Sequence, residues 1–258
     1  MPETHPEYIW NYYFYQDGNI EFEIRLSGIL QVYPAGPNEP NPHGTIVAPG
    51  VNAHVHQHIF SVRVDPMLDG IRNSVIESDI VSPASPTGSK ENFAGNAFRV
   101  KERILTDQVK DGARDFDWAA DRRWKIANLN RTHDVSGKPS SYQIMMKGGL
   151  LPLFAKDDSW MARRASYAHK VLWVVKDEEG PKGGKMWPSG KYVPQTREEP
   201  EDSVGRWVKE GHGSIDNEDI VLFLTVGALR LPCPFSLRDL FQTTIGTTHI
   251  PRPEDWPV

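Results

Sequence analysis

The sequence predicts an all-β protein, a large β-sandwich with long loops and few short helices. The first observation is composition: 21 prolines and 21 glycines accompany 8 tryptophans, 8 tyrosines and 10 phenylalanines, which favours strands joined by turn-rich loops. The second is an alternating apolar pattern near the N-terminus. The third is a pair of short apolar runs at residues 171–175 and 220–225. Strands at such spacing, without long helices between them, are typical of a sandwich.

The N-terminal pattern predicts a β-hairpin over residues 8–30. An aromatic-rich run ends at Tyr15, and Asp17 and Gly18 then give a strong turn signal. After the turn, apolar and polar residues alternate, so one face of the second strand is expected to be buried and the other wet. The alternating apolar residues are Ile20, Phe22, Ile24 and Leu26.

Less regular patterns follow the hairpin. Residues 34–42 form a turn-rich loop, and a long strand is expected over residues 51–64. Residues 65–140 are expected to be rich in loops, with a short helix at 117–126 as the best helical candidate. A length of 258 residues suits one large all-β domain or two small ones.

Composition also excludes several classes of function. The net charge of −5 offers no basic surface for nucleic acid, and no apolar run approaches the roughly 20 residues that span a bilayer. The polar N-terminus does not resemble a secretory signal. Because Cys233 is the single cysteine, stability is expected to come from packing or from metal rather than from an internal disulfide.

Three of the nine histidines lie at alternate positions: His54, His56 and His58. On a strand they share one face, about 7 Å apart at the backbone, so two imidazoles are able to hold one metal ion. Imidazole suits copper, zinc, iron or nickel, and the spacing does not decide among them. A third protein ligand must come from elsewhere, and His249 is the natural candidate. A polar sheet face without metal is the alternative.

Two blocks resemble a known family, the copper amine oxidases. Residues 52–60 resemble the copper-binding strand of that family. Residues 244–257 are similar to its second copper signature, T-x-G-x-x-H, an aliphatic residue, three further positions and then E-D-x-P, with every fixed position present. The hairpin and the blocks at 137–142, 187–191 and 215–219 also look like the family, and its fungal members are the most similar.

The resemblance implies the β-sandwich catalytic domain of the family, which is normally a homodimer and normally preceded by smaller α/β domains. It implies copper held by His56, His58 and His249. His54 is then a neighbour on the same strand face rather than a ligand. Since members continue beyond the position of Val258, residues 1–258 are expected to be a single partial, truncated sandwich domain with an exposed sheet edge.

The resemblance also implies a second divalent ion, calcium or another. Two carboxylates and two backbone carbonyls would hold it, while Met67 stands where some members have a further acidic ligand. A strand-end turn without metal is the alternative for these carboxylates. The implied ligands are Asp65, Pro66, Asp219 and Ile220.

In this family, copper and a topaquinone made from a tyrosine oxidise primary amines with dioxygen. The products are an aldehyde, ammonia and hydrogen peroxide, and an upstream aspartate is the base. The precursor motif, Asn-Tyr-Asp/Glu-Tyr, aligns here with Pro6 at the precursor tyrosine and His5 at the asparagine. Tyr8 is the second tyrosine of the motif; we expect its side chain on the opposite face of the strand and do not assign it as precursor. The aspartate lies upstream of this chain, which is therefore expected to be inactive alone.

Residues 228–243 are predicted to be an insertion within the domain. The segments 225–227 and 244–246 look like two copies of one motif, 19 positions apart. The insertion either bulges outward, because loop closure costs only about 0.6 kcal/mol per doubling of length, or displaces the second copper signature. In the first case His249 still reaches the metal; in the second a two-histidine half-site is left. Ser236 is a candidate cap for a short helix inside the insertion.

Two other functions stay open. One is a non-catalytic copper-binding fragment, and the other is a β-sandwich interaction module that uses exposed aromatic residues. By the resemblance, the expected partners are a primary amine, dioxygen and a second copy of the chain, but neither nucleic acid nor a membrane. An intracellular location, cytoplasmic or peroxisomal, is favoured.

Overall fold

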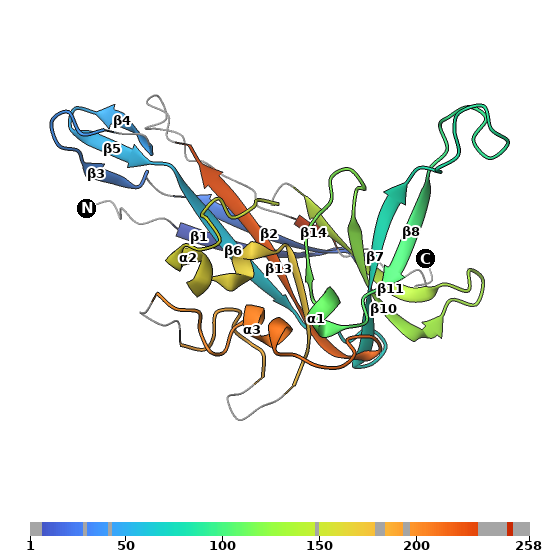
Figure 1. Cartoon of the computed structure of the whole chain (residues 1–258). Helices are drawn as coiled ribbons and strands as arrows, with labels where there is room; N and C mark the ends of the chain where they lie inside the picture. Colours follow the sequence, from blue (N-terminus) through green and yellow to red (C-terminus); the bar gives the residue numbers. More distant parts are fainter. Residues whose placement is uncertain are drawn as a thin grey trace.

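The structure is a computed structural model that describes residues 7–27, 30–40, 43–147, 150–178, 184–192, 197–231 and 247–249. For residues 7, 27, 147, 230 and 247–249 it describes the backbone alone. Strands are the main regular elements, and a few short helices lie on one side of them (Figure 1). Among the described helices none is long and apolar enough to cross a membrane.

The strands are β1 (Glu7–Phe14), β2 (Ile20–Ser27), β3 (Val32–Pro34), β4 (Gly44–Ala48), β5 (Val51–His54), β6 (His56–Val64), β7 (Arg72–Val81), β8 (Arg99–Ile104), β9 (Ala113–Arg114), β10 (Arg123–Thr132), β11 (Pro139–Lys147), β12 (Leu172–Lys176), β13 (Glu218–Arg230) and β14 (Thr247–His249). The helices are α1 (Gln108–Asp111), α2 (Trp160–Arg164), the 3-10 helix η1 (Ser166–His169) and α3 (Val204–Lys209).

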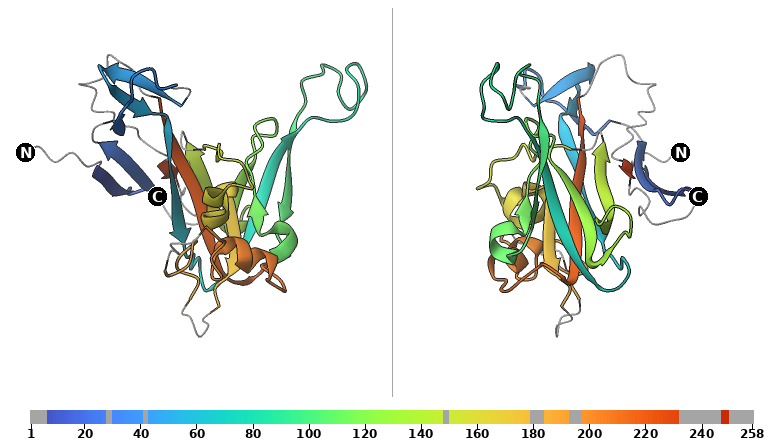
Figure 2. Two further views of the ribbon diagram at one scale, coloured as in Figure 1. Left: turned by 60° about the vertical axis from the view of Figure 1, so that its left-hand side comes forward. Right: turned by 90° about the vertical axis from the view of Figure 1, so that its right-hand side faces the viewer.

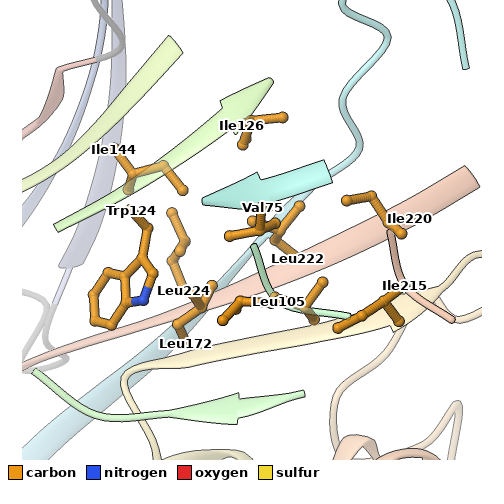
Figure 3. Packing of buried hydrophobic residues seen from close by; sticks show 11 residues of the cluster. Val75, Leu105, Trp124, Ile126, Ile144, Leu172, Ile215, Ile220, Leu222 and Leu224 are labelled. Carbon is orange, nitrogen blue, oxygen red and sulfur yellow. The ribbon is translucent and has the colours of Figure 1, made fainter. Parts of the chain in front are cut away.

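The predicted all-β sandwich is confirmed, and its strands pair antiparallel. Strand β13 pairs with β12 and with β6, while β8, β7, β10, β11 and β14 form the other run of paired strands. Apolar side chains from both runs meet in the main core (Figure 3). These residues are Val75, Leu105, Trp124, Ile126, Ile144, Leu172, Val174, Ile215, Ile220, Leu222 and Leu224.

Strands β12 and β13 are apolar on both faces because both faces are covered. Leu222 and Leu224 enter the main core, whereas Val221 and Phe223 pack under α3 against Val208. A strand that is buried on both faces appears as a continuous apolar run rather than an alternating one. The two runs that the sequence marked as buried strands are therefore both strands.

The predicted hairpin is also confirmed. β1 and β2 pair antiparallel, and Gly18, with φ of 82°, takes the left-handed conformation that the turn requires. The inner residues of β2, Phe22, Ile24 and Leu26, pack against Val226 of β13. Figure 2 shows this hairpin beside β14 on one side of the sandwich, and the two elements are in contact.

Residues 65–140 are rich in loops, as expected, although β7, β8, β9, β10 and the start of β11 also lie there. Two other expectations about the middle of the chain are wrong. The expected helix at 117–126 is a turn followed by β10, in which Trp124 and Ile126 alternate into the core. The strand expected over 51–64 is interrupted at Val55, where the chain passes from the small β3–β5–β4 sheet into β6.

Strand β13 is longer than the 220–225 run suggested. It continues to Arg230, and Ala228 pairs with His58 of β6. The predicted insertion at 228–243 therefore begins inside a strand, and its residues from 232 onward lie outside the described part of the chain. Cys233, Ser236 and Pro6 are also outside it.

Candidate metal centre

Two histidine side chains of β6 converge on one point. His56 and His58 are alternate residues of a strand, so they project from the same face. Their Nε2 atoms lie 3.1 Å apart, and their ring planes meet at 73°. Two nitrogen–metal bonds of about 2.0–2.1 Å span this separation at an angle of roughly 95–100°. Since that angle lies between those of square-planar and tetrahedral sites, the pair fits copper or zinc as it stands.

The orientation of His56 is fixed from behind. Its Nδ1 lies 3.0 Å from the backbone oxygen of His54. A carbonyl oxygen only accepts hydrogen bonds, so Nδ1 carries a proton, and in the neutral ring Nε2 then has a free lone pair. Histidines that bind metal in proteins usually have such an acceptor behind the ring.

Tyr8 stands behind His58 in a similar way. Its hydroxyl oxygen lies 3.2 Å from Nδ1 of His58, and the two rings meet edge to face with centroids 5.8 Å apart. The expectation that the Tyr8 side chain points away from this site is wrong. Residues two apart share a face of a strand, so the spacing of the motif gave no reason to expect Tyr8 on the opposite face.

His54 does not join the pair. The interruption at Val55 separates β5 from β6, and the backbone N–H groups of His54 and Val55 donate to the carbonyls of Gln31 and His43. The His54 ring packs on Tyr33, with centroids 4.5 Å apart. His54 is thus a neighbour that contributes its backbone oxygen, and the single strand face predicted for all three histidines is broken.

The backbone of His249 is placed, but its side chain lies outside the described part of the chain. β14 pairs with β11, with His249 opposite Met145, and it also contacts β2. Within the described residues, no three histidine, cysteine, aspartate or glutamate side chains group so as to hold a metal ion. The role of His249 as a third ligand stays a prediction.

Gln57, between the two histidines, faces the other way and clamps a loop. Its Nε2 donates to the backbone oxygen of Pro152 at 2.8 Å, and its Oε1 accepts from the N–H of Phe154 at 2.9 Å. Both contacts hold the strand that carries the histidines against residues 152–154. Sequence reasoning missed this residue, although the two-residue period of a strand already places it on the opposite face.

The carboxylates predicted for a second ion lie in an acidic cluster with one arginine. Arg63 donates to Asp65 at 2.9 Å and to Asp177 at 3.0 Å. The N–H of Asp177 donates to the backbone oxygen of Asp219. Burial, followed by the charges of Asp177 and Asp65, raises the pKa of Asp219 above its ordinary value.

An excess of negative charge at this place suits a cation. Among the described atoms, Oδ1 of Asp177 is buried without a hydrogen-bond partner. Sequence reasoning did not identify Asp177, because the fold alone brings the end of β12 beside β13. The assignment of Asp65, Pro66, Asp219 and Ile220 as ligands stays a prediction.

Comparisons with known proteins point to one family. Residues 6–236 match the family model described as copper amine oxidase, enzyme domain. The chain is 39% identical over 253 residues to the peroxisomal primary amine oxidase of Pichia angusta, covering 98% of this chain and 33% of that protein. It is also 39% identical over 254 residues to copper amine oxidase 1 of Schizosaccharomyces pombe, covering 98% of this chain and 32% of that protein.

The fold matches as well. The crystal structure of a copper-containing benzylamine oxidase from Hansenula polymorpha superposes with a TM-score of 0.84 at 27% identity, covering 95% of this chain and 37% of that one. The chain thus spans about a third of the length of the curated relatives it matches.

Proposed function

The chain belongs to the copper amine oxidase family, and we propose that His56, His58 and His249 hold the copper ion of that family. For the whole protein we propose the oxidation of primary amines by dioxygen to aldehydes, with release of ammonia and hydrogen peroxide. When bound, copper and a tyrosine-derived quinone supply the redox chemistry of such a reaction.

One observation carries the proposal: the Nε2 atoms of His56 and His58 lie 3.1 Å apart on one strand face. The two nitrogens are at hydrogen-bond distance, and a shared metal ion would hold them at the same separation. The His54 carbonyl behind the first ring and the Tyr8 hydroxyl behind the second support the same assignment. Gln57 holds the strand in place from the other face.

For this chain taken by itself we propose copper binding without amine oxidation. Proline stands at position 6, where the family motif has the tyrosine that becomes the quinone, and the motif gives no second precursor. An aspartate base is expected upstream of the segment that this sequence covers. The roles that its own residues fill are therefore to bind the metal and to orient the imidazoles.

Metal content tests the site directly. The purified chain is loaded with Cu(II), freed of excess and assayed for copper, beside His56→Ala, His58→Ala and His249→Ala. We expect about one copper per chain for the wild type and loss in the first two variants, because each of these substitutions removes one of the two converging imidazoles. Unchanged copper content in His56→Ala would sink the proposal.

The copper content of His249→Ala tests whether the insertion leaves His249 within reach of the metal. Loss of copper in this variant means that His249 reaches the strand ligands, whereas retention means a two-histidine half-site. His54→Ala is the matched control, because its ring packs on Tyr33 and only its backbone oxygen meets His56. It should keep its copper.

Absorbance and turnover test the proposal that this chain by itself binds copper without oxidising amines. The copper-loaded chain should show no quinone band and no hydrogen peroxide on addition of methylamine. A band accompanied by turnover would contradict the proposal that this chain is inactive alone.

An interaction module is the second candidate, because aromatic side chains of the hairpin are exposed. Tyr12 is 63% exposed and Phe14 is 76% exposed. If the chain is an interaction module, it should still bind its partner after substitution of both His56 and His58. The convergent histidines have no role in it, so we rank it below the metal site.

Three further proposals follow from the family. We propose a second divalent ion at Asp65 and Asp219 with the carbonyls of Pro66 and Ile220, supported by the raised pKa of Asp219. We propose a homodimer for the whole protein. An intracellular, peroxisomal or cytoplasmic location is supported by the name of the Pichia angusta relative, a peroxisomal primary amine oxidase.

A further inference from the structure

We propose that Tyr8 is a positioning residue of the metal centre. Its hydroxyl oxygen accepts the Nδ1–H of His58 and so directs the Nε2 atom of that ring toward the metal. The inference rests on the proposed copper site and adds a residue that the family motif does not place among the ligands.

The hairpin register brings Tyr8 to this place. Tyr8 pairs with Leu26 of β2, which is 1% exposed, so the face of β1 that carries Tyr8 is turned toward the sandwich. On the other face, Asn11 and Tyr13 donate to the carboxylate of Glu23 and hold the strand against rotation. The position of Tyr8 is thus set by the fold.

The ring of Tyr8 is held between two others. It meets Phe60 edge to face with centroids 5.8 Å apart, and it meets His58 at the same separation. Phe60 and His58 are themselves stacked along β6, with an interplanar angle of 9°. Such packing leaves the hydroxyl of Tyr8 pointed at Nδ1 of His58, 3.2 Å away.

Metal binding sets the direction of this hydrogen bond. A neutral imidazole carries one N–H, and a nitrogen bonded to metal must offer its lone pair. When Nε2 of His58 binds metal, Nδ1 is the donor and the Tyr8 oxygen is the acceptor. Tyr8 is 42% exposed, so its own hydroxyl proton is able to donate to water. In that case His56 donates to the carbonyl of His54, and His58 donates to the hydroxyl of Tyr8.

Tyr12 provides a matched control. It lies on the same strand and the same face as Tyr8, and its ring packs on Phe22 with centroids 4.9 Å apart. Its substitution by phenylalanine removes the same atom from the same aromatic cluster, away from His58. A general effect of a lost hydroxyl on the hairpin would appear in both variants.

The experiment compares Tyr8→Phe and Tyr12→Phe in the full chain loaded with Cu(II). The Cu(II) dissociation constant is measured by competition with a chelator, and the nitrogen couplings are recorded by electron paramagnetic resonance. Tyr8→Phe should weaken binding by about 10–100-fold, as the loss of an acceptor behind a metal-bound histidine does, and should alter the couplings. Tyr12→Phe should stay within about twofold of the wild type.

The metal-free chain separates positioning from general structure. Without copper, Tyr8→Phe should change the melting temperature no more than Tyr12→Phe does, because its proposed effect is on the bound metal. Equal losses of copper affinity in Tyr8→Phe and Tyr12→Phe would overturn the proposal. Melting curves of both variants show whether they fold, and Tyr8→Trp is a second test, since indole keeps the aromatic packing but donates and does not accept. Tyr8→Trp should also lose affinity.

The remaining outcomes distinguish failure of the proposed function from failure of this inference. If the wild-type chain binds no copper, the proposed function fails and this inference fails with it. If the wild type binds copper and Tyr8→Phe binds equally well with unchanged couplings, this inference alone fails. A quinone absorbance that Tyr8→Phe abolishes would also overturn it, because Tyr8 would then be a reacting group instead of a positioning one.

Discussion

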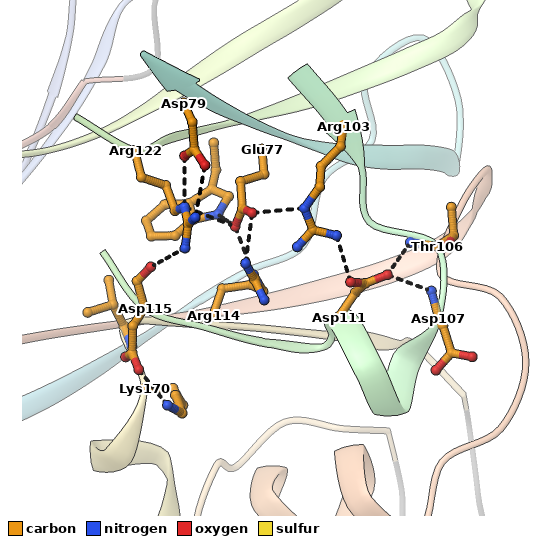
Figure 4. A network of polar contacts seen from close by, with 12 residues as sticks. Glu77, Asp79, Arg103, Thr106, Asp107, Asp111, Arg114, Asp115, Arg122 and Lys170 are labelled. Carbon is orange, nitrogen blue, oxygen red and sulfur yellow. Dashed lines mark hydrogen bonds and ion pairs between the residues drawn. The ribbon is translucent and has the colours of Figure 1, made fainter. Parts of the chain in front are cut away.

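Glu77 and Arg114 form a two-point ion pair in the interior of the fold. Nε and Nη2 of Arg114 donate to the two carboxylate oxygens, each at 2.8 Å, and the Glu77 side chain is 2% exposed. Arg103 donates to the same carboxylate at 3.0 Å (Figure 4). Trp124 also donates to it, at 3.1 Å. These residues come from β7, β8, β9 and β10, so a single carboxylate links strands of both runs of the sandwich.

The first prediction concerns this link. Glu77→Gln keeps the shape of the side chain but leaves Arg114, and in part Arg103, without a counter-charge. Removing one partner of a buried pair typically costs about 3–5 kcal/mol, so the free energy of unfolding should fall by about 3 kcal/mol in a denaturant titration.

Glu102→Gln is the control for that measurement. Glu102 binds Lys125 at 2.7 Å, but its side chain is 44% exposed. An exposed pair is worth about 0–1 kcal/mol, so this variant should change the unfolding free energy by less than 1 kcal/mol. Equal losses in the two variants would show that burial of Glu77 has no special importance.

The second prediction concerns how the stability of the chain changes at acidic pH. Burial acts to raise the pKa of Glu77, but the hydrogen bonds from Arg114 and Trp124 outweigh it and lower the pKa below its ordinary value. The hydrogen bond from Arg122 lowers the pKa of Asp79. For Asp111, burial again opposes the shift, and the hydrogen bond from Arg103 again leaves the pKa lowered.

The sign follows from the direction of these shifts. A lowered pKa in the folded state contributes stability above the unfolded value, about pH 4, and the contribution is lost as the pH falls through the lowered pKa. Denaturant titrations of the chelator-treated chain should therefore show constant stability down to about pH 5 and a steep loss below pH 4. Glu77→Gln should flatten that loss; an unchanged slope would contradict the assignment.

Local patterns in the sequence predicted the elements whose own residues determine them. The β1–β2 hairpin has its turn glycine and its alternation, and β12 and β13 are apolar because each is covered on both faces. The β7–β10–β11 sheet was missed, since polar residues such as Glu77 interrupt its apolar pattern, and Glu77 meets its arginines only in three dimensions.

The candidate metal centre likewise has some features that local sequence predicts and others that depend on the fold. The spacing of His56 and His58 predicted their convergence, because two alternate strand residues must share a face. The interruption at Val55 depends on hydrogen bonds to His43 and Gln31 and has no local signal. The contact of Tyr8 with His58 depends on how the hairpin packs across β6, which no spacing encodes.

The third prediction uses the raised pKa of Asp219. Burial and the charges of Asp177 and Asp65 disfavour its ionised form, so at neutral pH it destabilises the chain in the absence of a cation. Asp219→Asn should therefore raise the melting temperature at pH 7 in chelator. Because the folded pKa is raised, the difference should shrink as the pH falls through that pKa and vanish below the unfolded value.

Calcium should reverse the order of the melting temperatures of the wild type and Asp219→Asn. An ion bound at Asp65 and Asp219 stabilises the folded state in proportion to its occupancy, so the melting temperature of the wild type should rise with calcium and that of Asp219→Asn should not. Asp121→Asn is the control, because Asp121 pairs with Arg123 at 2.5 Å, away from this cluster. A wild type that does not respond to calcium would remove the support for a second ion.

The fourth prediction concerns Gly227, which lies beside the histidine strand. Gly227 pairs with Ile59 of β6, and a Cβ atom added there would lie 2.9 Å from the backbone oxygen of His58 and 3.4 Å from Leu151. Contact with backbone is not relieved by a rotamer change, so Gly227→Ala must push β6 away from β13. Overpacking of this kind typically costs about 1–3 kcal/mol.

The displacement should reach the metal, because the atom that is pushed belongs to His58 itself. Gly227→Ala should therefore lower both the melting temperature and the Cu(II) affinity. Gly36→Ala is the control, since its Cβ would meet only the flexible side chain of Glu39, at 3.6 Å. A variant with reduced stability but wild-type copper affinity would mean that the convergence of His56 and His58 tolerates a shift of the strand, and that the separation of their Nε2 atoms is set by the metal rather than by the fold.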